Sequence, residues 1–150
     1  MTRTFHSDAT LSSWGRVVRE RRVGGAVAAR APALAAELFD TGVNMGTGTA
    51  TAFLQRALNA LNRETRDYAD LAVDRRIGPA TLAALDAFLM KRGGDAGTVL
   101  LKAVEALQGA HYIILAEARP SQEAFLYGWL SNRIGNPRCT DSPDAHTPSI

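Results

Sequence analysis

The chain has the size and composition of one globular domain. It contains 150 residues, of which 46% are hydrophobic and 21% charged, which excludes the disordered and fibrous classes. The net charge of +2 conceals a basic beginning, because six arginines lie in the first 30 residues. Without a nucleic-acid-binding motif or interleaved aromatic residues, this charge does not predict a nucleic acid partner.

Residues 1–31 are predicted to form a poorly defined basic arm. They show no sustained hydrophobic period and contain Gly15, Gly24 and Gly25, which leaves room for one helical turn over residues 14–22. The apolar run of residues 23–29 is only marginally long enough for the hydrophobic core of a signal peptide, so we predict none.

The region of residues 32–135 is predicted to be all-α, with about five helices. The boundary signals are Pro32 and Gly46 for the first helix, a Thr49 cap for the second, Pro79 and Gly93 for the third, an Asp95 cap and Pro120 for the fourth, and Ser121 for the last. A short strand or extended segment is expected near residues 72–77. The Pro-rich residues 136–150 are predicted to be a mobile tail.

Apolar residues recur at helical spacing in each predicted helix. The expected packing residues are Leu34, Leu38, Phe39 and Gly42, then Phe53, Leu54, Ala57, Leu58 and Leu61, then Val99, Leu100, Ala103, Leu107 and Ile114, and finally Phe125, Trp129 and Leu130. The long stripe of residues 96–118 predicts the central helix of the fold. No apolar run approaches the ~20 residues that a membrane span requires, so we predict no span.

Most catalytic constellations are absent from the sequence. His6, His111 and His146 are too scattered to form a metal site, and Cys139 has no cysteine with which to pair. No phosphate-binding loop, dinucleotide fingerprint or nucleophile elbow occurs. The sequence therefore predicts neither a metal nor a cofactor.

Carboxylates are the remaining candidates for chemistry. Glycoside cleavage requires two of them, roughly 5 to 9 Å apart, one with a raised pKa. Glu37 and Asp40 are three residues apart on one predicted helix and satisfy that spacing. Glu37 is thus a candidate acid, although such a pair also occurs on ordinary solvated helix faces.

Asp40 and Asn44 form a second polar pair, four residues apart, beside apolar Phe39 and Val43. One hypothesis is a polar staple at the corner between the first two helices, with the pair accepting hydrogen bonds from backbone N–H groups near the following glycines. The alternative is contact with a ligand.

Two further groups have both a structural and a functional interpretation. Asp74 precedes a tight turn, which it is expected to cap rather than to serve chemically. Trp129, with Tyr127 and Arg133 on the same predicted helix, is arranged either as an aromatic floor for a sugar ring or as a core tryptophan with polar neighbours.

Four blocks of residues, in order, carry a family resemblance: Phe39-Asp40-x-x-Val43-Asn44-x-Gly46, Leu54-Gln55-x-Ala57-Leu58-Asn59, Asp74-x-x-Ile77-Gly78-Pro79-x-Thr81-Leu82, and Gln122-Glu123-x-Phe125-x-x-Gly128-Trp129-x-x-x-Arg133. Over about residues 32–135 the chain resembles the C-terminal, predicted peptidoglycan-binding part of the secretion-activator proteins of glycoside hydrolase family 108. These are phage-type muramidases with a lysozyme-like helical fold.

The resemblance implies a lysozyme-like helical domain, incomplete at its N-terminus, whose partners are peptidoglycan glycan strands. It also implies a bacterial or phage protein, made in the cytoplasm and acting in the periplasm or cell wall if exported. Together with Tyr127 from the aromatic pattern, the candidate peptidoglycan-binding or structural residues are Asp40, Asn44, Gln55, Asp74, Trp129 and Arg133.

Two departures from the family pattern affect what can be transferred. Relatives carry a Glu-Gly-Gly-Tyr segment whose Glu is the proposed acid, and this sequence has none; Glu20 is followed by Arg21 and Arg22 instead of glycines. The turn that usually reads Asp-Gly has Arg75 after Asp74. Arginine suits that turn only where a positive φ is not required, so we expect a local change of geometry.

Three functions remain open at this point. The first is a peptidoglycan-associated module without its own catalytic acid. The second is an active N-acetylmuramidase that uses a non-standard carboxylate such as Glu37. The third is a non-enzymatic accessory protein that binds another chain, or a second copy of itself, through apolar surface left exposed by the missing segment.

Overall fold

The computed structural model describes residues 24–135, and this part of the chain is helical with no strand. The all-α prediction is therefore confirmed. Residues 24–28 form a helical segment that leads into the first long helix. The elements that follow are α2 (Pro32–Met45), α3 (Thr47–Ala60), α4 (Pro79–Arg92), α5 (Ala96–Ala118), the 3₁₀ turn η1 (Pro120–Gln122) and α6 (Glu123–Arg133).

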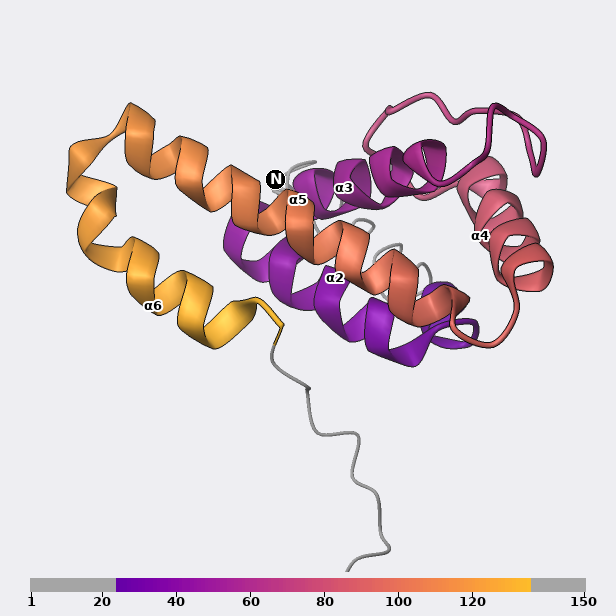
Figure 1. The fold of residues 1–150 in the computed structure, drawn as a ribbon, viewed down its shortest axis with the longest axis horizontal. Helices are drawn as coiled ribbons and strands as arrows, with labels where there is room; N and C mark the ends of the chain where they lie inside the picture. The colour runs from indigo at the N-terminus through magenta and orange to yellow at the C-terminus, as the bar shows by residue number, and fades with distance from the viewer. Residues whose placement is uncertain (1–23, 136–150) are drawn as a thin grey trace, which may run out of the picture.

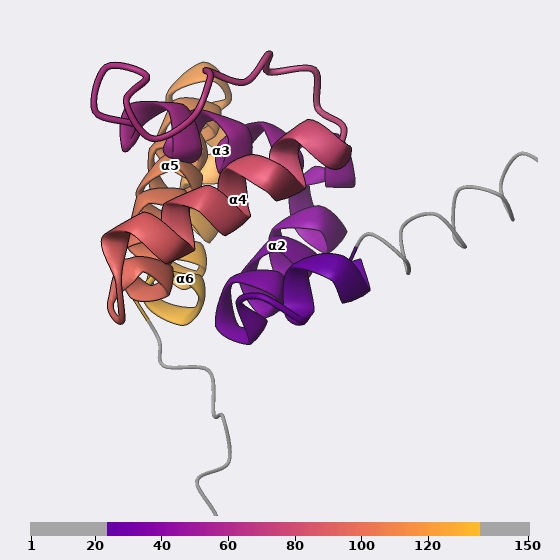
Figure 2. The ribbon, with the colours of Figure 1, turned by 90° about the vertical axis from the view of Figure 1, so that its right-hand side faces the viewer.

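Helix α5 organises the arrangement, as the apolar stripe predicted. It runs the length of the molecule and contacts α2, α3, α4 and α6. Figure 1 shows α4 at one end of α5 and α6 folded back along the other end. In the side view of Figure 2, α4 crosses in front of α3 and α5, and α2 lies on the other side of α4 from α5.

The core lies where α2, α3, α4 and α5 meet. Its largest fully buried apolar side chains are Val27, Leu34, Leu54, Leu58, Leu85, Phe88, Leu100 and Val104. Burying one such side chain contributes roughly 1.5 to 3 kcal/mol. Val27 and Ala31 belong to this core although they precede the boundary expected at residue 32, so the folded part begins within the region expected to be an arm.

Proline and glycine set most helix ends. Pro32 and Pro79 each lie in the first turn of a helix, where the missing N–H costs nothing. Gly46 and Gly93 follow α2 and α4 with φ of 89° and 86°, values that other residues rarely adopt. The capping prediction for Thr49 is wrong, because α3 already begins at Thr47. Ser121 lies in the turn η1, so the last helix begins later, at Glu123.

Some residues expected to pack are instead exposed. Phe39 is 74% exposed and Ile114 58% exposed, since neither faces a neighbouring helix. The apolar surface of α5 has a further consequence: by length and composition alone, Ala96–Ala118 is long and apolar enough to cross a membrane, with 28% of its most apolar window buried. The prediction that no apolar run approaches the length of a membrane span is therefore wrong for residues 96–118. The central helix of a soluble bundle can have the same length and hydropathy.

The segment between α3 and α4 is an irregular loop, residues 61–78, rather than a strand. It runs back along α3 and is held by three amide side chains, two from that helix and one, Asn62, from the start of the loop itself. Asn59 donates to the Leu71 carbonyl and accepts from its N–H, both at 2.8 Å. Asn62 does the same for Tyr68, at 2.7 and 3.2 Å, and Gln55 binds the turn that ends the loop.

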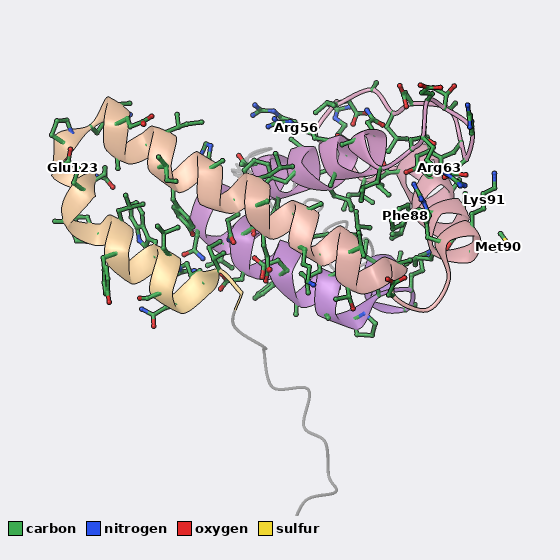
Figure 3. All side chains as sticks on the ribbon, viewed as in Figure 1. Arg56, Arg63, Phe88, Met90, Lys91 and Glu123 are labelled. Atoms are coloured by element: carbon green, nitrogen blue, oxygen red, sulfur yellow. The ribbon has the colours of Figure 1, made fainter. Side chains whose placement is uncertain are left out.

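Asp67 anchors the start of this loop. Its carboxylate, 2% exposed, accepts from Arg63 Nε at 3.0 Å and lies 3.6 Å from Arg92 Nε. Lys91 Nζ donates to its carbonyl at 2.7 Å, and Figure 3 shows Arg63 and Lys91 projecting at this end of the molecule. The hydrogen bond from Arg63 is the main reason why the pKa of Asp67 lies below its ordinary value.

Arg75 in the closing turn has a φ of 64°. The expectation that arginine would avoid a positive φ here is wrong: the turn keeps the left-handed conformation that glycine adopts without strain, and an arginine occupies it. For a residue with a side chain this conformation costs roughly 1 to 2 kcal/mol. The turn persists because Gln55 binds it from the helix side.

We expect Arg75→Gly to raise the free energy of unfolding by about 1 kcal/mol, because the strain removed exceeds the flexibility that glycine adds to the unfolded chain. Urea unfolding followed by circular dichroism measures this change. Arg76→Gly is the matched control, since Arg76 has no positive φ, and it should destabilise. Equal effects of the two substitutions would contradict the assignment of strain to Arg75.

Acid should weaken the Asp67 anchor selectively. The pKa of Asp67 is lower in the folded than in the unfolded state, so its stabilising contribution is present above about pH 4 and is lost as the pH falls through the folded-state pKa. Asp67→Asn should therefore destabilise strongly at pH 7 and much less near pH 2. Glu117→Gln, which removes an exposed carboxylate of α5, is the control. A pH-independent effect of Asp67→Asn would disprove this account.

Candidate functional site

The predicted site residues fall into two clusters. The first, which we call the α6 junction, comprises Glu37, Asp40, Thr41, Gln108, Tyr112, Trp129 and Arg133, where α2, α5 and α6 meet. The second, the Gln55 turn, comprises Gln55, Asp74, Arg75, Arg76 and Thr81. Asn44 and Tyr127 lie on the surface.

Asp40 ties α2 to α6. Arg133 Nη1 donates to Asp40 Oδ2 at 2.9 Å, and both side chains are about 30% exposed. Asn44 does not bond the Asp40 carboxylate but donates from Nδ2 to its backbone carbonyl at 2.7 Å, one turn back. The pair is therefore not the staple of the α2–α3 corner that the spacing suggested, because the carboxylate points to a helix 93 residues further along the chain.

The α2–α3 corner itself is built from glycines. Gly46 turns the chain with a φ of 89° and donates its N–H to the Gly42 carbonyl at 3.0 Å. A Cβ on Gly42 would lie 3.4 Å from Thr47 Cγ2, so the two helices approach closely at this point. The position before α3 is Gly46 and carries no capping side chain.

Glu37 is buried, at 1% exposure, inside the α2–α5 interface. Its Oε1 accepts from Thr41 Oγ1 at 3.2 Å, and Thr41 Oγ1 accepts in turn from Gln108 Nε2 at 3.0 Å. This chain of hydrogen bonds joins α2 to α5 within the core. A general acid has to reach the leaving-group oxygen of its substrate, and Glu37 has no open surface through which to do so in this arrangement.

Gln108 and Tyr112 are site residues that the sequence analysis missed. Both are buried, and Gln108 Oε1 and the Tyr112 hydroxyl have no hydrogen-bond partner. Burial raises the pKa of Tyr112, an effect that the nearby Arg133 opposes. Their positions could have been predicted from their spacing. Gln108 and Tyr112 continue, at intervals of four residues, the row of buried residues that begins with Leu100 and Val104, so they lie on the core face of α5.

The aromatic residues of α6 do not form one floor. Trp129 stacks on Tyr112, with centroids 5.0 Å apart and planes at 27°, and on Phe125 at 6.0 Å and 26°. Tyr127 is 84% exposed and lies two residues from Trp129, on the opposite side of the helix. Trp129 thus serves to pack α6 on α5, and the exposed aromatic surface near it belongs to Phe125.

The Gln55 turn is tightly bonded. Gln55, 1% exposed, donates from Nε2 to Asp74 Oδ1 at 2.8 Å, to the Arg76 carbonyl at 3.0 Å and to Thr81 Oγ1 at 3.2 Å. Its Oε1 accepts from Arg75 N–H at 3.1 Å. Asp74 Oδ1 also accepts from Arg76 N–H at 2.9 Å, and these bonds lower the pKa of Asp74, with the Gln55 bond the largest cause.

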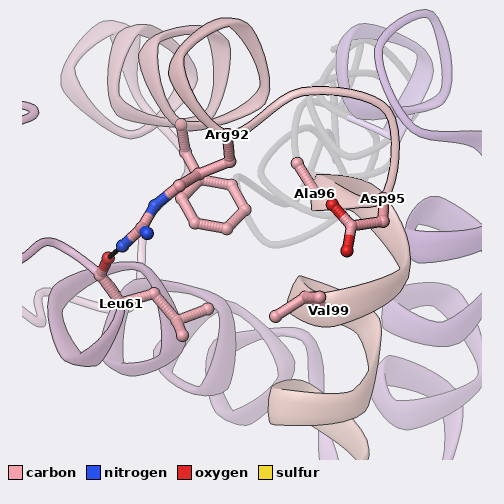
Figure 4. A pocket seen from close by; sticks show the side chains of 6 residues that line it. Leu61, Arg92, Asp95, Ala96 and Val99 are labelled. Carbon is pink, nitrogen blue, oxygen red and sulfur yellow. Dashed lines mark hydrogen bonds between the residues drawn. The ribbon is translucent and has the colours of Figure 1, made fainter.

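A shallow pocket of about 210 Å³ lies elsewhere, between the end of α3, the end of α4 and the start of α5. Its lining consists of Leu61, Phe88, Arg92, Asp95, Ala96 and Val99, drawn in Figure 4. Arg92 is held there by a 2.6 Å hydrogen bond from Nη2 to the Leu61 carbonyl. None of the predicted site residues lines this pocket. Within residues 24–135, no three His, Cys, Asp or Glu side chains gather as a metal site.

Comparison with known proteins assigns the helical region. No curated protein matches the chain. A family described as a predicted peptidoglycan domain matches residues 49–134, more than half of the chain. The matched range contains most of α3, all of α4 to α6 and the whole Gln55 turn. It includes Trp129 and Arg133 but neither Glu37 nor Asp40. The chain therefore belongs to the predicted peptidoglycan domain family.

Proposed function

We propose that the protein is the peptidoglycan-associated module of a muramidase-type secretion activator, and that it binds glycan strands without a catalytic acid of its own. Family membership supports association with peptidoglycan and with the cell wall. The finer assignment, to the glycoside hydrolase family 108 type, depends on the four blocks of residues that the chain shares with those proteins and on the order in which they occur.

The burial of Glu37 is the observation that carries the non-catalytic part of the proposal. Retaining and inverting glycosidases both place two carboxyl groups on either side of the scissile bond. Glu37 is enclosed at 1% exposure and bonded to Thr41, while Asp40 is engaged by Arg133. The two carboxylates, three residues apart in sequence, thus each bind a group within the helix bundle, Glu37 that of Thr41 and Asp40 that of Arg133.

The full chain should sediment with purified Gram-negative sacculi and should leave the turbidity of a sacculus suspension unchanged. Glu37→Gln should bind as well as the wild type, because its side chain is inside the bundle. The alternative, an active N-acetylmuramidase that uses Glu37, predicts clearing by the wild type and none by Glu37→Gln. Glu20→Gln controls for the only glutamate in the basic beginning of the chain.

A specific observation favours an accessory function as the second candidate. Phe39 and Val43, 74% and 70% exposed, lie one turn apart on the outer face of α2. These two exposed apolar side chains form a small ridge, which we call the α2 ridge. In a symmetric dimer, two copies of such a ridge can pack against each other and become buried. This ridge suits a second copy of the same chain.

If the α2 ridge pairs two copies, light scattering should report a dimer at high concentration, and Phe39→Ser should convert it to a monomer without loss of helical signal. Met90→Ser is the matched control, because Met90 is 78% exposed on α4 and stands away from the ridge. A wild-type monomer at every concentration tested would disprove pairing, as would a dimer that both variants retain.

A further inference from the structure

We propose that the Gln55 turn presents a carboxylate-binding surface, formed by Arg75 and Arg76, that recognises the free carboxylates of peptidoglycan stem peptides. The inference rests on the proposed function and names the chemical group that would be bound. It begins from an arginine held in a conformation that its own side chain disfavours.

Arg75 keeps a φ of 64° where glycine would be unstrained. Strain of this kind persists only where the surroundings fix the conformation, and it is concentrated at functional sites. Here Gln55 fixes it: its amide accepts from Arg75 N–H at 3.1 Å and donates to the Arg76 carbonyl at 3.0 Å. The buried amide therefore holds the turn rigid while the two arginines that follow Asp74 remain exposed.

The stem of Arg75 lies along the first turn of α3. A Cβ added at Gly48 would lie 3.6 Å from Arg75 Cβ and 3.7 Å from its Cδ, so the aliphatic part of the side chain covers this glycine. Arg56 follows two turns later on α3 and, as Figure 3 shows, projects outward from that helix. The turn thus presents the exposed guanidinium groups of Arg75 and Arg76, with Arg75 beside the first turn of α3, and the same helix carries Arg56 as a further exposed cation.

These guanidinium groups are available for a ligand. Around the α3–α4 loop, Arg63 and Arg92 are engaged by Asp67, and Arg66 by Glu64. Arg56, Arg75 and Arg76 take part in none of the ion pairs found within residues 24–135.

The nearest acidic group, Asp74, only partly offsets this positive charge. Its Oδ1 already accepts from Gln55 Nε2 and from Arg76 N–H, so this oxygen is engaged within the turn. Asp70, further back in the loop, is bonded to Asn62. The two guanidinium groups of Arg75 and Arg76, beside the one exposed carboxylate of the turn, leave a surface of net positive charge.

A carboxylate matches this surface in shape as well as charge. The planar guanidinium donates two parallel N–H groups to the two oxygens of a carboxylate. Stem peptides carry free carboxylates at regular intervals along the cell wall, so that weak individual contacts add up on an extended ligand. Phosphate polymers also bind guanidinium groups, which makes them the competing occupant in the test.

The test is co-sedimentation of the full chain with purified sacculi, before and after carbodiimide-driven amidation of their carboxylates. Arg75→Gly combined with Arg76→Ala should weaken binding about tenfold, the effect of losing roughly 1.4 kcal/mol of charge-assisted hydrogen bonding. Amidated sacculi should show the same loss with wild-type protein. Arg119→Ala, which removes an exposed arginine at the far end of α5, should bind as the wild type does.

The single variant Arg75→Gly distinguishes a loss of binding from a loss of folding. It should stabilise the protein and yet weaken its co-sedimentation with sacculi. Binding that survives both the double substitution and amidation would overturn the inference and leave the proposed function intact. Competition by polyphosphate at lower concentrations than by soluble stem peptide would overturn it in favour of a phosphate ligand. Absence of wild-type sedimentation would overturn the proposed function and this inference together.

Discussion

Three amide side chains, two on α3 and one just beyond its end, determine how the α3–α4 end of the molecule is built. Gln55, Asn59 and Asn62 follow one another at helical spacing, and each offers a donor and an acceptor to the same stretch of loop backbone. Asn59 pairs with both backbone groups of Leu71, as a neighbouring strand would. Because an unpaired buried backbone group costs about 1 to 3 kcal/mol, these amides allow residues 61–78 to stay ordered without forming a strand.

The α6 end is held in a different way. Helix α6 has no fully buried residue, so it depends on a few directed contacts rather than on a shared core. Arg133 binds Asp40 of α2, Trp129 stacks on Tyr112, and Ile134 approaches Gly109 to within 3.8 Å of where a Cβ would stand. A Cβ at Gly109 would meet Ile134 and Leu130 at ordinary van der Waals distances, so these two side chains pack directly on the surface of α5 at this position.

The sequence predicted the helices well because their ends are marked locally. Pro32 and Pro79 lack an N–H that the first turn of a helix does not use, and Gly46 and Gly93 permit the positive φ that ends one. Side-chain partners were less predictable. The spacing of Asp40 and Asn44 placed both on one face of a helix but could not reveal that α6 supplies the cation. The exposure of Phe39 was missed for the same reason, since periodicity identifies a face and not the element that covers it.

Glu37 and Asp40 show why residue spacing alone does not establish a catalytic pair. Their separation of three residues satisfies the distance that glycoside cleavage requires, and on that basis they were candidates. Packing gives them different surroundings, however, because α5 encloses Glu37 while Asp40 remains half-exposed beside Arg133. What a carboxylate can do depends on the elements packed against it. Here those elements use both carboxylates to join helices, and the charges left free at the Gln55 turn are arginines, which suit binding rather than acid catalysis.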